Sequence, residues 1–549
     1  MNALMPIARA IITGAIAAAP VAGIAAAPAP RLIVAISVDQ FSADLYAAYR
    51  ASFTGGLKRL GEGAVFPSGY QSHAATETCP GHSTILTGSR PARTGIIANN
   101  WFDLSLPEGK QKVYCSEDPA LRTAGSDDYV VSPKYLKVPT LGDRMKAANP
   151  ASRSVAISGK DRGAVMMGGH DTDAIWYWGG KRFVTLRGRD GTEPMIVSEI
   201  NRRVAAAVSR PPRPVLPAQC RTRDRSVAIG QGKSVGRLAD RKAEDFSGFR
   251  RAIEFDSLTG DLAIGLMRAM RLGQGAAPDV LAVSFSATDY VGHAYGPGGA
   301  EMCAQMVALD ATIGKLLAAA DATGVPYAVV LTADHGGLDL TERELEQAIP
   351  RAARVDKAVD GRPIGDAVKR ELGLRFDGPL LYTDGAFGDY YLSRAVPADQ
   401  RDRALSLVRA KLLALPQVAD VLLADDLRRV RPGAMPVDEW SLPERFAASF
   451  DSSRSGDLLV ALKPQVTPIV DPTKGYVATH GSPWQYDRRV PMLFWRSGGE
   501  GFEQPLPVET VDILPTLAAL IGLPVPADEI DGRCLDLDPG AGDSCKAAR

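Results

Sequence analysis

Five runs of apolar, mostly β-branched residues recur along the chain, and each run ends in polar residues. They are LIVAISVDQ (32–40), SVAISGKDR (154–162), DVLAVSFSATD (279–289), YAVVLTADHGG (327–337) and VPMLFWRSG (490–498). Short, continuous apolar runs are typical of strands that are buried on both faces of a sheet. The pattern therefore predicts five buried strands.

Helical patterns separate these strands. Residues 301–324 form one of them, and residues 508–522 form another after the last strand. The alternation indicates an α/β fold with a mainly parallel central sheet flanked by helices. Ligands of such folds bind beyond the carboxyl ends of the strands. The polar residues expected at that rim are Asp39, Lys160, Asp289, Asp334 and His335.

The length of 549 residues allows one large α/β domain with insertions, or two to three smaller domains. Residues 205–250 and 350–450 are rich in Arg, Pro and Asp and lack strong strand runs. We expect one catalytic domain over residues 28–549, with these two stretches as insertions or a cap.

The N-terminus is typical of a secretory signal peptide over residues 1–27. It carries Arg9, then an Ala-rich apolar stretch, and then small residues suited to cleavage near positions 25–29. An uncleaved membrane anchor is the alternative, but Pro20 and several glycines interrupt a stretch that is barely long enough to span a bilayer. The pattern predicts a periplasmic or secreted protein that does not contact the membrane after signal cleavage.

The formal charge is zero, with 63 Lys+Arg against 63 Asp+Glu. Nothing in this global balance suggests nucleic acid or an anionic membrane surface as a partner. Any preference for anions has to be local. We expect a monomer that acts on small molecules.

Six cysteines follow the signal, an even number in a chain expected to enter an oxidising compartment. Some disulfides are therefore expected, and six cysteines allow 15 full pairings. Cys534 and Cys545 bracket a short Gly/Asp-rich loop and form the best single pair. The sequence contains no CxxC motif, so a metal would be held by His and carboxylate ligands.

Only six histidines occur, and three of them lie in segments suited to metal binding. These segments are DYVGH (Asp289, His293), ADHGG (Asp334, His335) and ATHGS (His480). Imidazole nitrogen and carboxylate oxygen both bind Zn²⁺. Neighbouring side chains of a strand point to opposite faces, so Asp334 and His335 can share a site only if the chain turns, which Gly336 and Gly337 permit.

The chain resembles the alkaline phosphatase superfamily, in particular its single-chain, phosphodiesterase-like branch that includes monoesterases with a threonine nucleophile. The motifs that carry this resemblance span most of the mature chain. They are SVDQF (37–41), TETCPGHSTILTGSRPARTGIIANNW (76–101), SGKDRGAVMMGG (158–169), the three Asp/His segments and the late VDILPTL helix.

The resemblance implies two zinc ions and a nucleophile. It assigns one zinc to Asp39, Thr78, Asp334 and His335, and the other to Asp289, His293 and His480. It makes Thr78 the nucleophile, and Zn²⁺ would lower the pKa of its hydroxyl so that a phosphothreonine could form. A helix that opens just after Thr78 would add partial positive charge near the phosphoryl group.

Cys79 is the alternative nucleophile, since a thiol is intrinsically more reactive. No basic residue flanks it to lower its pKa, and an exported thiol is as readily part of a disulfide. A sulfatase is disfavoured as well, because this chain reads CPGHS where a sulfatase carries Cys, then Pro two positions on and Arg two beyond that.

The substrate class depends on Asn99, Lys160 and Arg162, which resemble the phosphate-contacting residues of the monoesterases. Two Zn²⁺, three aspartates and a threonine alkoxide sum to zero, and Lys160 and Arg162 then add two positive charges, which match a dianionic monoester. Asn99 is chosen over Asn100 from motif position alone. The alternatives are a nucleotide pyrophosphatase or phosphodiesterase with the same two metals, and a non-catalytic phosphate or metal binder.

Overall fold

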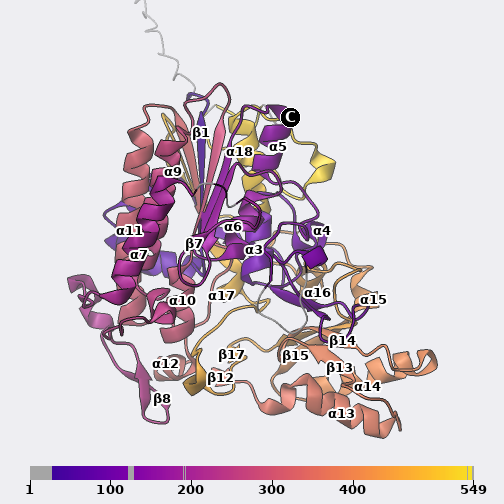
Figure 1. Ribbon diagram of the computed structural model, residues 1–549. Helices are drawn as coiled ribbons and strands as arrows, with labels where there is room; N and C mark the ends of the chain where they lie inside the picture. Colours follow the sequence, from indigo (N-terminus) through magenta and orange to yellow (C-terminus); the bar gives the residue numbers. More distant parts are fainter. Residues whose placement is uncertain are drawn as a thin grey trace, which may run out of the picture.

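The computed structural model describes residues 27–121, 129–189, 191, 193–433, 435–540 and 542–546. The proposed signal peptide, residues 1–27, lies outside this range except for its last residue. A central ten-stranded sheet runs through the molecule (Figure 1). Its strand order is β19 (Phe502–Glu503), β2 (Ala64–Tyr70), β18 (Arg489–Arg496), β11 (Tyr327–Thr332), β1 (Leu32–Val38), β10 (Asp279–Phe285), β5 (Ser154–Ser158), β6 (Ala174–Trp178) and β7 (Phe183–Val184), with β20 (Val508–Glu509) paired to β2.

All five apolar runs are strands of this sheet, which confirms the expected α/β class. Strands β11, β1, β10, β5 and β6 are parallel neighbours. Strand β18 is antiparallel to both β11 and β2, so the sheet is mixed. An apolar run shows that a strand is buried but carries no information on its direction.

Helices cover both faces of the sheet. Successive residues of a strand point to opposite faces, so a continuous apolar strand presents apolar side chains on both faces. In β1, Val34 and Ile36 belong to one core, whereas Ile33 and Ala35 belong to the other. The first core is covered by α7 (Met195–Ser209), α9 (Ile253–Ala269) and α11 (Ala300–Asp321), on the left in Figure 1. The second is covered by α3 (Thr78–Ile85), α5 (Leu141–Ala148), α6 (Asp161–Gly168) and α18 (Ile513–Leu520).

Helix α11 confirms the helix expected from 301–324. Within the described residues it is the one helix long and apolar enough to cross a membrane, but most of its apolar window is buried. It packs against α9 and α2 (Gly56–Leu60), as a core helix does. The helix expected over 508–522 is shorter, because β20 and a 3-10 turn (Thr510–Asp512) precede α18.

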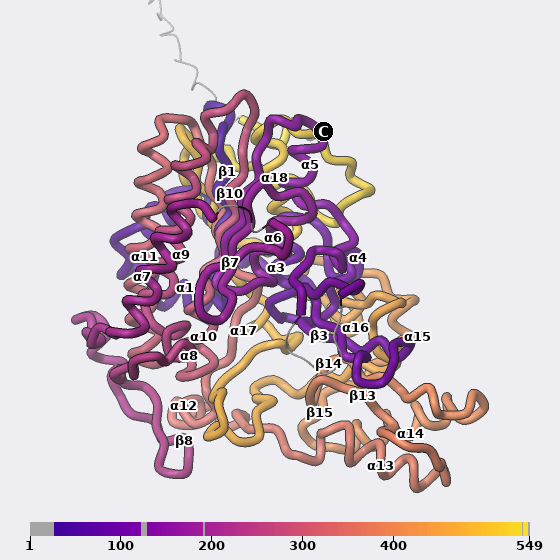
Figure 2. Tube along the Cα trace, in the orientation of Figure 1, coloured from indigo at the N-terminus to yellow at the C-terminus, as the bar shows by residue number. Residues whose placement is uncertain are grey.

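A second sheet projects from the main body at the lower right of Figure 2. Its order is β13 (Leu381–Thr383), β14 (Gly388–Leu392), β16 (Leu458–Leu462) and β15 (Val418–Leu423), and α13 (Gly361–Glu371) and α14 (Arg401–Leu413) pack on it around a separate core. Three of these strands lie in 350–450, where we expected no strong strand runs. They are short and bury mainly one face, so their apolar signal is weak. The domain boundaries stay a prediction.

Three disulfides tie the chain together within the described residues: Cys79–Cys115, Cys220–Cys303 and Cys534–Cys545. The third confirms the pair chosen from the sequence. The first lies beside Thr78.

Candidate functional site

The expected rim exists at the carboxyl ends of four neighbouring strands. Asp39 directly follows β1, Lys160 follows β5, Asp289 lies on α10 (Ala287–Tyr295) after β10, and the adjacent Asp334 and His335 follow β11. Parallel strand ends meet at one edge of a sheet, which is why residues hundreds of positions apart converge here. The Lys160 Nζ lies 2.6 Å from Asp39 Oδ2 and 2.6 Å from Asp289 Oδ2.

One group of side chains surrounds His335 and is completely buried. The His335 Nε2 lies 3.4 Å from Asp39 Oδ1 and 3.3 Å from Asp334 Oδ2. Backbone N–H groups of Gln40 and His335 donate to Asp334 Oδ1, which leaves Oδ2 to face this group. The chain turns after β11, so the adjacent Asp334 and His335 share one site, as we expected.

A second group surrounds Asp289. Its Oδ1 lies 3.2 Å from His293 Nε2 and 3.4 Å from His480 Nε2. His480 reaches the rim from a loop before α17 (Gln485–Arg488), and its ring stacks on His335 with centroids 3.6 Å apart. The two groups are therefore contiguous.

The three histidines share one tautomer. Each Nδ1 lies within hydrogen-bond distance of a backbone carbonyl: His293 to Ala478 at 2.9 Å, His335 to Gly336 at 2.9 Å and His480 to Thr76 at 2.8 Å. A carbonyl only accepts, so Nδ1 must carry the proton and Nε2 offers a lone pair. Burial lowers the pKa of His335 to about 3 and also lowers the pKa of His480, so both rings are neutral. The Nε2 atoms of all three histidines thus face carboxylates.

The carboxylate oxygens and Nε2 atoms that face one another have too few hydrogen-bond donors. In the part of the chain that the structure describes, Asp39 Oδ1, Asp289 Oδ1 and Asp334 Oδ2 accept no hydrogen bond, and His335 Nε2 has none either. Burial, followed by the charges of Asp289 and Asp334, holds the pKa of Asp39 well above its usual range. Buried anions of this kind are paired or bind metals. A donor set of imidazole nitrogens and carboxylate oxygens fits divalent cations of the zinc type.

Lys160 provides positive charge within this cluster. Burial lowers the pKa of Lys160, but the carboxylates of Asp289 and Asp39 outweigh that effect and keep its pKa above the usual value. We expected Lys160 to contact phosphate. In the structure its ammonium bridges two carboxylates and lies 3.4 Å from Thr78 Oγ1. A cation held by the same carboxylates would repel this ammonium towards an anionic substrate.

Thr78 is the first residue of α3, so the helix expected at this position does open at the candidate nucleophile. Its side chain is buried, and the helix N-terminus directs partial positive charge towards it. Glu77 beside it has no signal in the sequence, whereas the spacing of His82 from Thr78 predicts packing or a hydrogen bond at the start of the helix. Glu77 accepts the Asn99 N–H at 2.7 Å, and burial raises its pKa to about 7. His82 lies one turn later, with Nδ1 2.9 Å from the Thr78 carbonyl and 3.1 Å from Asp334 Oδ2.

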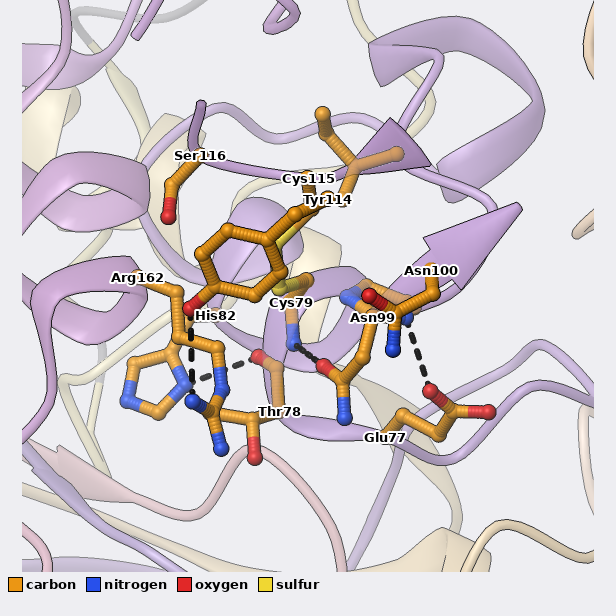
Figure 3. The surroundings of a disulfide bond; sticks show 12 residues. Glu77, Thr78, Cys79, His82, Asn99, Asn100, Tyr114, Cys115, Ser116 and Arg162 are labelled. Atoms are coloured by element: carbon orange, nitrogen blue, oxygen red, sulfur yellow. Dashed lines mark hydrogen bonds between the residues drawn. A yellow bond between two sulfur atoms is a disulfide. The ribbon is translucent and has the colours of Figure 1, made fainter. Parts of the chain in front are cut away.

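Asn99 and Arg162 lie on opposite sides of Thr78, with Asn99 towards Glu77 and Arg162 towards His82 (Figure 3). The Cys79 N–H donates to Asn99 Oδ1 at 2.8 Å, which leaves the Asn99 amide nitrogen as a donor for a ligand. Asn100 instead donates to Asp384 Oδ2 at 3.0 Å, towards the second sheet. The geometry therefore favours Asn99 over Asn100. Cys79 is in a disulfide, so it offers no thiolate as a rival nucleophile.

Comparison with known proteins gives three findings. Residues 33–483 match the family model described as type I phosphodiesterase / nucleotide pyrophosphatase. Alkaline phosphatase PhoD of Zymomonas mobilis is 50% identical over 94% of this chain and 89% of its own length, and alkaline phosphatase PhoK of a Sphingomonas species is 51% identical over 95% and 93%. A crystal structure of alkaline phosphatase PafA superposes with a TM-score of 0.80 at 25% identity, covering 92% of this chain and 99% of that one.

Proposed function

This chain belongs to the type I phosphodiesterase / nucleotide pyrophosphatase family, within the alkaline phosphatase superfamily, and on that premise we propose that it is a zinc-dependent alkaline phosphatase. It is a phosphoric monoester hydrolase, in line with its relatives that are named alkaline phosphatases. One observation carries the metal part of the proposal. The Nε2 atoms of three histidines and the carboxylates of three aspartates face one another beside Thr78.

Two groups of residues would hold the ions. The first is Asp39, Thr78, Asp334 and His335, and the second is Asp289, His293 and His480. When bound, zinc lowers the pKa of a coordinated hydroxyl and stabilises negative charge on reacting oxygens.

The residues of the chain would divide the remaining tasks. Thr78 Oγ1 attacks phosphorus as the bond to the ester oxygen breaks, so the alcohol leaves and a phosphothreonine forms; water then breaks the bond between Oγ1 and phosphorus and releases inorganic phosphate. Its position at the start of a buried helix favours the negative charge that gathers there. Asn99 donates through its amide nitrogen, Arg162 through its planar guanidinium, and Lys160 as a point charge, so that the phosphoryl group is held in line with Thr78.

The same three residues favour monoesters. Lys160 and Arg162 add two positive charges to a metal site that is formally neutral, and a monoester brings two negative charges. A diester brings one negative charge and a second substituent in the space next to the Lys/Arg pair. The rival is a nucleotide pyrophosphatase or phosphodiesterase, which the description of the family itself includes.

Export is the last part of the proposal. All six cysteines are paired in disulfides, as suits an oxidising compartment, and the first 27 residues have the pattern of a signal peptide. We therefore place the mature enzyme in the periplasm or outside the cell, where it acts as a monomer on small phosphate esters.

A comparison of substrates tests the central claim. We expect an aryl phosphate monoester to react with a higher kcat/KM than its methyl diester, and faster diester hydrolysis would make the rival correct. Thr78→Ala should lower kcat by at least about 1,000-fold, while Thr78→Ser should keep part of the activity because it keeps the hydroxyl. Mass spectrometry of acid-quenched Thr78→Ser and native protein should find phosphate on residue 78. A zinc-loaded native protein without hydrolytic activity would instead indicate a binder.

A further inference from the structure

A short hairpin connects Asn99 and Arg162, two of the residues expected to contact phosphate, with the proposed nucleophile Thr78. Strand β3 (Asn100–Phe102) directly follows Asn99, and it pairs with β4 (Lys112–Tyr114). Tyr114, the last residue of β4, is partly buried next to Arg162. Figure 3 shows its ring lying between Cys115 and the Arg162 guanidinium.

The hydroxyl of Tyr114 has a settled hydrogen-bond role. It lies 2.9 Å from Asp161 Oδ1 and 3.3 Å from Arg162 Nη1. A carboxylate only accepts and a guanidinium only donates, so Tyr114 donates to Asp161 and accepts from Arg162. Burial raises the pKa of Tyr114 to about 12, so the hydroxyl keeps its proton, and with it this role, in alkaline solution.

Arg162 has few other anchors. The shortest contact from its guanidinium to the Asp161 carboxylate is 4.0 Å, too long for a hydrogen bond. Its Nε makes no hydrogen bond within the described residues. The Tyr114 hydroxyl is therefore the contact that fixes the direction of the guanidinium fork.

The Cys79–Cys115 disulfide fastens this hairpin to the nucleophile. Cys115 follows Tyr114, and Cys79 follows Thr78. The two cysteines are buried, and both also bind Asn99: the Cys115 N–H donates to its carbonyl at 3.0 Å, and the Cys79 N–H donates to Oδ1 at 2.8 Å. One covalent bond thus joins the segments that carry Thr78, Asn99 and the support of Arg162.

We propose that Tyr114 is a positioning residue that holds the Arg162 guanidinium at a fixed place relative to Thr78, with the Cys79–Cys115 disulfide as the clamp of that geometry. The inference rests on the proposed function, because it takes Arg162 as a ligand of the phosphoryl group. A fixed Arg162 guanidinium would add a source of selectivity for monoesters over diesters. A bidentate arginine discriminates between anions only when its fork is held in one orientation, and the dianionic monoester gains most from it.

Substitution of the hydroxyl tests the proposal. Tyr114→Phe should lower kcat/KM for the aryl monoester by roughly fivefold to 20-fold and change that for the methyl diester less than about twofold. Tyr129→Phe is the matched control: Tyr129 also donates to Asp161, at 2.7 Å, but has no hydrogen bond to Arg162 among the described residues, so the monoester-to-diester ratio should stay near the native value. Equal losses on both substrates would indicate a merely structural role and overturn the inference.

A double-mutant cycle tests the positioning role of Tyr114 separately from the proposed role of Arg162 in binding phosphate. Arg162→Ala should lower the monoester-to-diester ratio by itself, and Tyr114→Phe added to it should cause no further change, because Tyr114 acts through Arg162. Additive losses would refute the positioning role. If Arg162→Ala leaves the ratio unchanged, the proposed role of Arg162 fails, and if the native protein lacks phosphatase activity, the proposed function itself fails.

The clamp has its own test. Cys79→Ala/Cys115→Ala should shift the ratio in the same direction as Tyr114→Phe, whereas Cys534→Ala/Cys545→Ala, which opens a remote disulfide, should not. Competitive inhibition by inorganic phosphate provides a second measurement, which needs only correctly folded protein at low concentration. The inhibition constant should rise at least about fivefold in the clamp variant, and an unchanged constant would refute the clamp.

Discussion

His82 contacts the proposed metal site without belonging to it. Its Nδ1 faces two acceptors, the Thr78 carbonyl and Asp334 Oδ2, so Nδ1 carries the proton. Its Nε2 then accepts from Ser284 Oγ at 2.9 Å. This residue therefore connects the nucleophile segment, one aspartate of the first metal group and strand β10.

Removal of this contact should weaken zinc binding. Residues that orient metal ligands typically change metal affinity by about 10- to 100-fold when substituted, and we expect His82→Ala to fall in this range. Competition with a chromogenic zinc chelator measures the effect. The control is His170→Ala, since His170 binds Asp143 on α5, away from the rim. An unchanged zinc affinity in His82→Ala would show that Asp334 needs no such support.

Some residues of the site are marked by a local sequence pattern, and others are not. Asp39, Asp334 and His335 follow apolar strand runs, so the chain itself marks their place on the rim. His82 offered only its spacing of four from Thr78 on a helix. Tyr114 lies in a weak, three-residue strand, and its role depends on Arg162, 48 positions away. Contacts of this kind come from tertiary packing and leave no local pattern.

Helix α3 has to approach the end of β11 closely, because Thr78 and Asp334 belong to one proposed metal group. Gly81 allows this approach. A Cβ at position 81 would lie 1.9 Å from the Asp334 carbonyl oxygen and 2.6 Å from its carbonyl carbon, both of which are backbone atoms. Neither segment could absorb such a clash by a change of rotamer.

Gly81→Ala should therefore reduce activity although it removes no functional group. We expect kcat/KM for a monoester to fall by at least about 100-fold, since shifts near 1 Å in reacting geometry have effects of this size. Gly540→Ala is the control, because a Cβ there meets nothing within 4 Å. Activity near the native level in Gly81→Ala would mean that the helix and strand end can separate without loss of geometry.

At the scale of elements, the sequence predicted the buried strands well and the exposed ones poorly. Strands β1, β10 and β11 are buried along their whole length, so their apolar runs are continuous. Strands β13 and β15 expose part of their side chains to solvent, and the run is broken. The antiparallel direction of β18 follows from the path of the chain through the second sheet, which no local pattern contains.

Across the whole molecule, two disulfides close loops of very different length. Cys220–Cys303 spans 83 positions and ties a 3-10 turn to α11, whereas Cys534–Cys545 spans 11. The entropy of loop closure predicts that loss of the longer link costs about 4 to 5 kcal/mol and loss of the shorter one about 3 kcal/mol.

Denaturant unfolding of the two double-alanine variants measures this difference. We expect Cys220→Ala/Cys303→Ala to have the lower free energy of unfolding, by about 1 to 2 kcal/mol, relative to Cys534→Ala/Cys545→Ala. Both should keep the native monoester-to-diester ratio, because neither bond touches the rim. The reverse order would show that native contacts around the C-terminal loop outweigh chain entropy.

Zinc should stabilise the whole fold, and more so at alkaline pH. In the metal-free protein the raised pKa of Asp39 means that the folded state binds a proton more tightly than the unfolded chain. The stability of the metal-free protein therefore falls as the pH rises from the usual carboxyl pKa towards the raised one. Zinc at the proposed site would replace that proton and pair with the ionised carboxylates, so its contribution should grow over the same range.

Thermal unfolding with and without zinc, at pH 5 and at pH 8.5, tests this linkage. Zinc at about 1,000 times its dissociation constant should contribute about 4 kcal/mol at pH 8.5, and proton competition should remove a large part of that at pH 5. Asp39→Asn, which keeps the shape but removes the titrating group, should raise the stability of the metal-free protein at pH 8.5 and abolish most of the stabilisation by zinc. A zinc effect that is equal at both pH values would mean that the buried carboxylates are not the ligands, because ligation by Asp39 requires zinc and protons to compete for the same oxygens.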